Sequence, residues 1–267
     1  MELLEISTLH LGLACLLALV PLAILLWYRL PMIGRTLAAL VRMAVQLLFV
    51  GLYLSVVFEL DRPWLTLLWL VAMIGVADLS VARGCGLRFA KAGPILFAAL
   101  LAGSLLPMLY FTGVILARPN MFEAQYAIPL GGMVLGNCLR ADIVGLSRFL
   151  DSLRKQEKPF LQALAQGATL AEAVRPHVRD ALQAALAPTV ATIATIGLVS
   201  LPGMMTGVIL AGADPMSAVK YQMVIMLAIF SGTALTLVLA LRLALRTAFT
   251  AYGLLDESVF REEGGLG

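Results

Sequence analysis

The sequence predicts an all-α protein, a polytopic integral membrane bundle of about seven transmembrane helices that forms one domain over residues 1–267. Three observations lead to this fold class. Hydrophobic residues make up 61% of the chain and charged residues only 13%, which is not the balance of a soluble domain. Several uncharged runs are long enough to cross a hydrocarbon layer of about 30 Å. A single long polar stretch, residues 150–187, interrupts them.

Seven segments are expected to span the membrane. The first, 8–28, contains Pro21, which predicts a kink. The sixth, 180–214, contains Pro188 and Pro202, so its outer half is expected to be irregular or broken. The other five are expected at 37–58, 63–82, 92–117, 122–148 and 221–241. With an odd number of spans, the two termini lie on opposite sides of the membrane.

Basic residues are distributed unevenly between the connections. Of the 19 Lys and Arg residues, 15 lie after the first, third, fifth and seventh spans, and only Arg62 and Arg118 lie in the alternate connections. Because basic connections stay in the cytoplasm, the N-terminus is predicted outside, and the C-terminus and the polar stretch are predicted in the cytoplasm of a bacterial-type inner membrane. The net charge of +3 is too small to indicate a nucleic-acid partner.

The polar stretch carries the clearest local signals. Gly167 interrupts one helical pattern, and Thr169 with Glu172 three residues later forms the pattern of a capping box. Pro176 is expected to end the new helix, because proline cannot donate a backbone hydrogen bond. The sequence therefore predicts a short, separately capped stub at 170–175, on the side where a soluble partner could bind it.

Motifs that would make the chain an enzyme are absent from the sequence. It contains no GxxxxGK[ST] phosphate loop, no HExxH and no GxSxG. Cys15, Cys85 and Cys138 show no metal-binding spacing, and neither His10 nor His177 has a ligand partner at helical spacing. If ATP drives this protein, a second polypeptide must bind it.

Polar residues within the spans are candidates for a translocation path, and each has a structural alternative. Asp78 could line a cation path, or lie at the interface near Arg83. Asn137 and Arg140 share one helix face, from which Asp142 points away. These three could equally be solvated near the cytoplasmic end of their span.

The step at Pro202 and Gly203 is the preferred candidate for the gate, because non-helical backbone at membrane depth is tolerated where it lines a wet cavity. Met204 and Met205 follow it, and their thioethers are either soft ligands or packing groups. Pairs of glycines four apart permit close helix approach, within one chain or between two copies, and they occur at Gly132/Gly136 and Gly203/Gly207.

Parts of the chain resemble a known family. Residues 163–175 and 184–188 resemble the cytoplasmic coupling loop of ATP-binding cassette (ABC) transporter permeases. Residues 199–207, 209–212 and 218–222, together with 132–137, are similar to the FetB-type iron-export permeases, whose plant relatives act in aluminium tolerance. The similarity covers most of residues 130–230.

This resemblance implies a homodimeric permease subunit that works with two ABC ATPase subunits and exports iron or another metal ion. The chain itself would bind no cofactor, because ATP and Mg²⁺ would be bound by the ATPase. The residues that the resemblance implies in coupling are Ala163, Gly167, Thr169, Leu170, Glu172, Arg175 and Arg179. The residues expected in the path or gate, from their own chemistry, are Pro202, Gly203, Met204, Met205, Asn137 and Asp78.

Two other classes remain open. An ion-coupled secondary transporter would need no ATPase and would depend on an intramembrane carboxylate such as Asp78. A membrane scaffold or receptor subunit would use the same cytoplasmic stub for docking without moving any solute. The residues do not identify the solute or assign a metal site.

Overall fold

A computed structural model of the protein describes residues 7–60, 62–117, 120–247, 249 and 258, and within these ranges the chain forms helices and no strands. The elements are α1 (Thr8–Cys15), the 3₁₀ turn η1 (Leu16–Ala18), α2 (Leu19–Trp27), α3 (Ile33–Leu60), α4 (Pro63–Gly84), α5 (Phe89–Tyr110), the π-helical η2 (Phe111–Ile115), α6 (Ala124–Lys155), α7 (Glu157–Ala165), α8 (Leu170–Thr195), α9 (Gly203–Leu210) and α10 (Pro215–Thr247). The polytopic all-α fold class is thereby confirmed.

Six segments in the described part of the chain are long and apolar enough to cross a membrane: His10–Trp27, Ile33–Leu60, Pro63–Gly84, Phe89–Ile115, Ala124–Lys155 and Pro215–Leu245. They correspond to six of the seven expected spans. The first is interrupted by the 3₁₀ turn η1, which ends at Ala18, shortly before Pro21.

The remaining expected span, 180–214, is divided between two helices. Helix α8 ends at Thr195, Ile196 is extended, and Gly197 has a positive φ of 85°. Pro202 then caps α9, which has only eight residues. The predicted break in the outer half is therefore confirmed, and it lies between residues 196 and 202.

The prediction that residues 170–175 form a separate short helix is wrong. Helix α8 continues without interruption through Pro176 and Pro188 for 26 residues. Each internal proline removes one backbone hydrogen bond, but one side of α8 is buried along its length by Ala173, Val174, His177, Ala181 and Ala185. Tertiary packing of this face outweighs the local preference for a stop, as it does for most helices in proteins.

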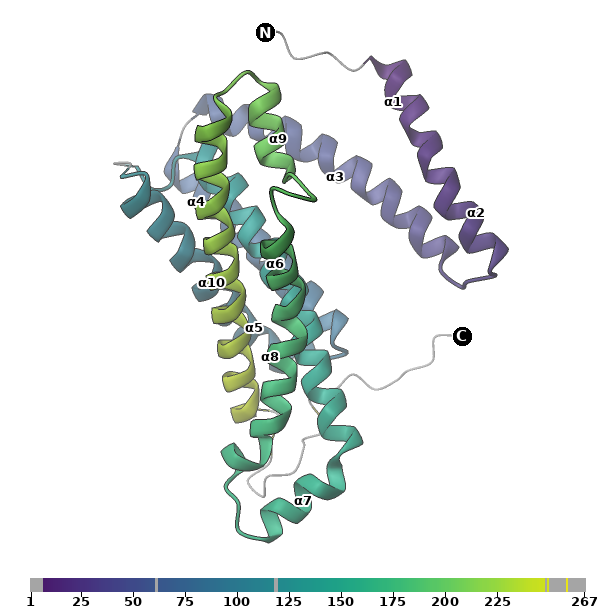
Figure 1. Ribbon diagram of the computed structural model, residues 1–267, viewed down its shortest axis with the longest axis vertical. Coiled ribbons are helices and arrows are strands. Elements are labelled where there is room, and N and C mark those ends of the chain that lie inside the picture. The colour runs from purple at the N-terminus through teal and green to yellow at the C-terminus, as the bar shows by residue number, and fades with distance from the viewer. Residues whose placement is uncertain (1–6, 61, 118–119, 248, 250–257, 259–267) are drawn as a thin grey trace.

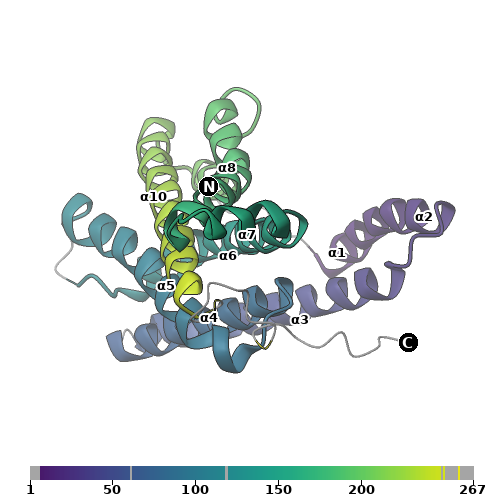
Figure 2. The same ribbon diagram turned by 90° about the horizontal axis from the view of Figure 1, so that it is seen from below.

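Helices α4, α5, α6, α8 and α10 form the bundle, and α6, α8 and α10 run side by side along its length (Figure 1). Helix α7 lies at one end of this group and α9 at the other. Helices α1 to α3 project from the bundle (Figure 2). Val57 is the buried residue of α3, and no residue of α2 is buried.

Two glycines set the crossing of α5 and α10. A Cβ added to Gly103 would meet the side chain of Thr236 and lie 2.8 Å from its backbone nitrogen. A Cβ added to Gly232 would lie 2.7 Å from the Gly103 carbonyl oxygen. The two backbones therefore touch, which is the role of small residues in membrane helix packing. By contrast, Gly136, Gly203 and Gly207, all from the expected glycine pairs, have open space around them.

His177 joins α8 to its neighbours at the end near α7. Its Nδ1 atom lies 2.7 Å from Ser152 Oγ of α6, and its ring meets Phe160 of α7 edge-on, with 6.3 Å between ring centroids. Burial lowers the pKa of His177 below its usual value of 6.5, while the Asp180 carboxylate opposes that shift. The neutral imidazole is thus the form that fits the folded protein.

We expect Gly103→Ala to destabilise the protein by about 1–3 kcal/mol, because the added methyl group must push apart two helix backbones in contact. Thermal unfolding in detergent checks this. Gly75→Ala on α4 is the matched control, since its Cβ meets nothing within 4 Å. Equal unfolding temperatures for the two variants would contradict the crossing described above.

We also expect stability to fall as the pH is lowered from about 7.5 to about 5.5, because the unfolded state then binds a proton at His177 that the folded state excludes. His177→Gln should reduce this fall, since glutamine stays neutral. Hydrogen exchange of α8 amides, corrected for intrinsic rates, measures the effect. His10→Gln, at the exposed second histidine, is the control. An unchanged pH dependence in His177→Gln would refute the assignment.

Candidate functional site

A cavity of about 450 Å³ lies where α6, α8, α9 and α10 meet. The backbone break between α8 and α9 forms one of its walls, through Ile196 and Ser200 to Pro202. We call it the polar cavity, because side chains that can form hydrogen bonds lie among its apolar lining. They are Asn137, Arg140, Thr189, Thr192, Ser200 and Gln222.

Four of the residues expected in the path or gate surround this cavity. Pro202, Gly203 and Met204 come from the start of α9, and Asn137 comes from α6, so the fold brings together positions 65 residues apart. Asn137 donates one amide hydrogen to the Met133 carbonyl oxygen of its own helix, at 2.8 Å. Its amide oxygen has no hydrogen-bond partner in the described part of the chain.

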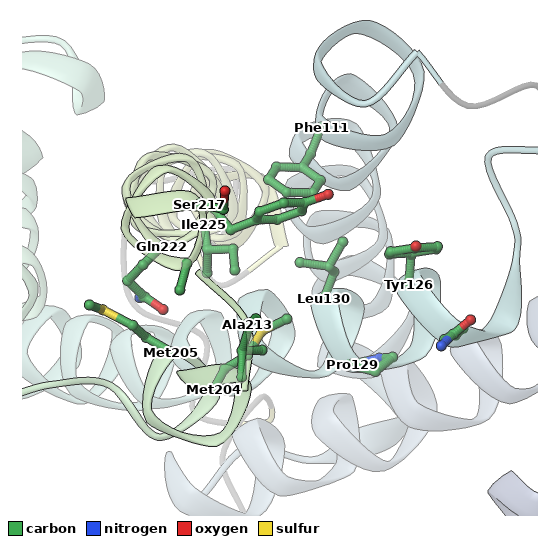
Figure 3. Close-up of a pocket in the computed structure, with 14 residues that line it drawn as sticks. Phe111, Tyr126, Pro129, Leu130, Met204, Met205, Ala213, Ser217, Gln222 and Ile225 are labelled. Atoms are coloured by element: carbon green, nitrogen blue, oxygen red, sulfur yellow. The ribbon is translucent and has the colours of Figure 1, made fainter. Parts of the chain in front are cut away.

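A smaller cavity of about 250 Å³ adjoins the first and is almost entirely apolar. Figure 3 shows the side chains of Met204 and Met205 below Gln222 and Ile225 of α10, with Pro129 and Leu130 of α6 across from them. Met204 lines both cavities, whereas Met205 does not line the polar one. We call this second space the methionine cavity.

Gln222 stands at the junction of the two cavities and was given no role by the sequence. It lines both of them, is only 6% exposed, and its side-chain amide makes no hydrogen bond to another described residue. The sequence did offer one signal for Gln222, since it is a polar residue next to the start of an expected apolar span. Thr189 and Thr192 were also missed, although they follow Pro188 at the helical spacing that places both on one face.

The two intramembrane carboxylates lie away from the polar cavity. Asp78 of α4 is 2% exposed, and its Oδ1 atom has no hydrogen-bond partner in the described part of the chain. Asp142 of α6 is fully buried, with neither oxygen paired there. Asp78, expected either in a path or at the interface, lies within the helix packing and does not line the polar cavity.

The residues expected in coupling gather at the turn between α7 and α8. Gly167 has a φ of 95° and ends α7 in a Schellman motif, in which its N–H donates to the Leu164 carbonyl and the Ala168 N–H donates to the Ala163 carbonyl. The turn is therefore closed by hydrogen bonds from both sides of the glycine.

The capping box at the start of α8 is present as the sequence predicts. Glu172 accepts hydrogen bonds from the Thr169 N–H at 2.9 Å and hydroxyl at 2.7 Å, and the Glu172 N–H points back to the Thr169 hydroxyl oxygen at 3.3 Å. The Thr169 side chain, followed by its backbone N–H, lowers the pKa of Glu172. Leu170 is half-buried behind the cap, while Arg175 and Arg179 are exposed on α8.

The described residues include no group of three or more His, Cys, Asp or Glu side chains placed to hold a metal ion. Asn137, Gln222 and the hydroxyls of the polar cavity are neutral groups. Within the described residues, the cavity therefore offers hydrogen bonds and one positive charge.

Comparison with known proteins identifies relatives along most of the chain. A family model described as "Uncharacterised protein family (UPF0014)" matches residues 8–249. The chain is 37% identical over 205 residues to the UPF0014 membrane protein slr1647 of Synechocystis sp., covering 77% of this chain and 79% of that protein. No solved structure matches the chain.

Two further relatives bear on the resemblance seen in the sequence. The Probable iron export permease protein FetB of Escherichia coli is 32% identical over 210 residues, covering 79% of this chain and 80% of that protein. The UPF0014 membrane protein STAR2 of Oryza sativa is 31% identical over 247 residues, covering 91% of this chain and 85% of that protein. The resemblance is confirmed, and the chain belongs to the UPF0014 family of integral membrane proteins.

Proposed function

We propose that this chain is the membrane permease subunit of an ATP-driven ABC transporter that exports iron or another metal ion from the cytoplasm. Its relative FetB is named a probable iron export permease, which supports both the transport role and the solute. In this proposal the chain works as a homodimer in the inner membrane, and a separate ATPase chain binds ATP and Mg²⁺.

The observation that carries this proposal is the continuity of α8. Its 26 residues extend for about 39 Å. Its first turn is the capped tip beside α7, and its last turns, with Thr189 and Thr192, form a wall of the polar cavity. A partner that moved the tip would thus move the wall of the cavity without any joint between them.

The tip has the features of a docking point. Gly167 and Thr169 are exposed, and their hydrogen bonds hold the turn in one conformation. Arg175 and Arg179 offer exposed cations on the first turns of α8, where they can pair with carboxylates of an ATPase. In the proposed orientation, with the N-terminus outside, this tip lies in the cytoplasm, where the ATPase hydrolyses ATP.

A second function is favoured by one specific observation, the burial of Asp78 and Asp142 without hydrogen-bond partners for three of their four oxygens. Such carboxylates are costly within a membrane and often carry protons or coupling ions. An ion-coupled secondary transporter would use them and would need no ATPase. This candidate ranks second because neither residue lines the polar cavity.

We expect the full chain in nanodiscs to co-purify with its candidate ABC ATPase, and Fe²⁺, supplied together with an anionic chelator such as citrate, to raise ATP turnover by the complex. Replacing residues 167–175 by an unrelated loop should abolish co-purification, because the swap removes the capped tip. Co-purification without stimulation by Fe²⁺ would contradict iron as the solute. If the chain does not bind the ATPase, the ion-coupled secondary transporter becomes the preferred function.

A finer variant in the same experiment is Thr169→Ala, which weakens the first turn of α8 by about 1 kcal/mol. We expect the complex to form but Fe²⁺-stimulated turnover to fall, since the tip no longer transmits motion as a stiff unit. Thr195→Ala is the matched control, because that exposed hydroxyl bonds only within α8. Normal stimulation of Thr169→Ala would show that the cap has no part in coupling.

A further inference from the structure

The charge of the polar cavity is unusual for a site that handles bare metal cations. Arg140 is the one charged residue in its lining, and no Asp or Glu lines it. Arg140 lies near the middle of α6, a helix of 32 residues that is apolar enough to span a membrane. Ionisable residues within membrane spans face bundle interiors or wet cavities and mark solute paths, and Arg140, which is exposed in the single chain, borders the polar cavity.

No carboxylate in the described part of the chain pairs with the Arg140 guanidinium. Asp142, two positions along α6, projects from the opposite side of the helix and is fully buried there. A guanidinium is protonated at any physiological pH and carries five N–H donors in a planar fork. Arg140 therefore brings a permanent positive charge and open donors to the cavity.

Neutral hydrogen-bond donors line the same cavity as this charge. The Gln222 amide is buried without a partner and borders the cavity, and Asn137 retains a second amide hydrogen after its bond to Met133. The Thr189 hydroxyl makes no hydrogen bond within the described residues and is half-buried. A planar cationic fork with amide and hydroxyl donors beside it is the arrangement that recognises carboxylate or phosphate oxygens.

We propose that the polar cavity binds a solute bearing an oxyanion, either a free carboxylate or phosphate compound or a metal ion carried as its anionic complex. Arg140 binds the oxyanion, and Gln222, Asn137 and Thr189 complete its hydrogen bonds. The inference rests on the proposed transport function and names the chemical class of its solute. A bare divalent cation is disfavoured in this cavity, because it meets a like charge and no carboxylate.

Equilibrium dialysis of the full chain in phosphatidylcholine nanodiscs tests this directly. The probes are radiolabelled citrate alone, citrate with Fe³⁺, and radiolabelled Fe²⁺ without a chelator. We expect citrate to bind in at least one of the first two arms and Fe²⁺ not to bind. Binding of citrate alone identifies a free anion as the solute, and binding that requires Fe³⁺ identifies the anionic complex.

Arg140→Gln should weaken citrate binding about tenfold or more, which is the usual effect of losing hydrogen bonds to a charged group. Arg140→Lys should fall between this variant and the unchanged protein, since lysine keeps the charge but not the fork. Arg148→Gln is the matched control, because Arg148 is an exposed arginine of the same helix outside the cavity. All three variants are first compared with the parent by size-exclusion chromatography, and Arg140→Lys keeps the test decisive if Arg140→Gln fails to fold.

Three results would overturn the proposal: binding of Fe²⁺ but not citrate, equal citrate binding by Arg140→Gln and Arg148→Gln, or displacement of citrate by phosphatidylglycerol, which would make the cavity a lipid headgroup site. The assay contains neither ATPase nor ATP. If the chain does not bind the ATPase, citrate binding by the cavity would still support this inference. If the cavity does not bind citrate, the co-purification with the ATPase would still test the proposed function by itself.

Discussion

The packing of α8 against α6 is the interaction on which the rest of the structure depends. Small residues, Ala173, Ala181 and Ala185 among them, bring the two helices into close contact, and this contact keeps α8 helical through two prolines that would otherwise end it. Because the helix is continuous, the turn after α7 and the wall of the polar cavity belong to one stiff element. The hydrogen bond between His177 of α8 and Ser152 of α6 holds the two helices together near the first turns of α8.

After Thr195 the chain leaves the helical conformation, and the polar cavity lies beside this break. The Gly197 N–H donates to the Ser200 carbonyl oxygen at 2.9 Å, which closes a tight turn in place of a further helical turn. Helix α9 then restarts at Pro202. Where backbone leaves the helix at membrane depth, its polar groups need a protein or water environment. The polar cavity lies directly against this break, so non-helical backbone and polar side chains line the same space.

Local signals in the sequence were sufficient for six of the seven expected spans, for the capping box at Thr169 and for the break near Pro202, because each depends on neighbouring residues alone. The stop at Pro176 was predicted wrongly, since burial against another helix decided it. The crossing at Gly103 and the roles of Arg140 and Gln222 depend on which helices meet around these residues. Periodicity assigns residues to faces of a helix but does not say which face meets a cavity.

In the proposed mechanism, α8 moves as one rigid body between the ATPase and the cavity. Spin labels at the exposed positions Ala171 and Ala194, about 35 Å apart along a straight helix, allow this to be measured by electron double resonance in the complex with its ATPase, after removal of the three native cysteines. We predict that this distance stays the same with and without ATP, while the distance from Ala194 to a label at exposed Met223 of α10 changes. A distance along α8 that shortens on ATP binding, through bending at Pro176 or Pro188, would contradict it.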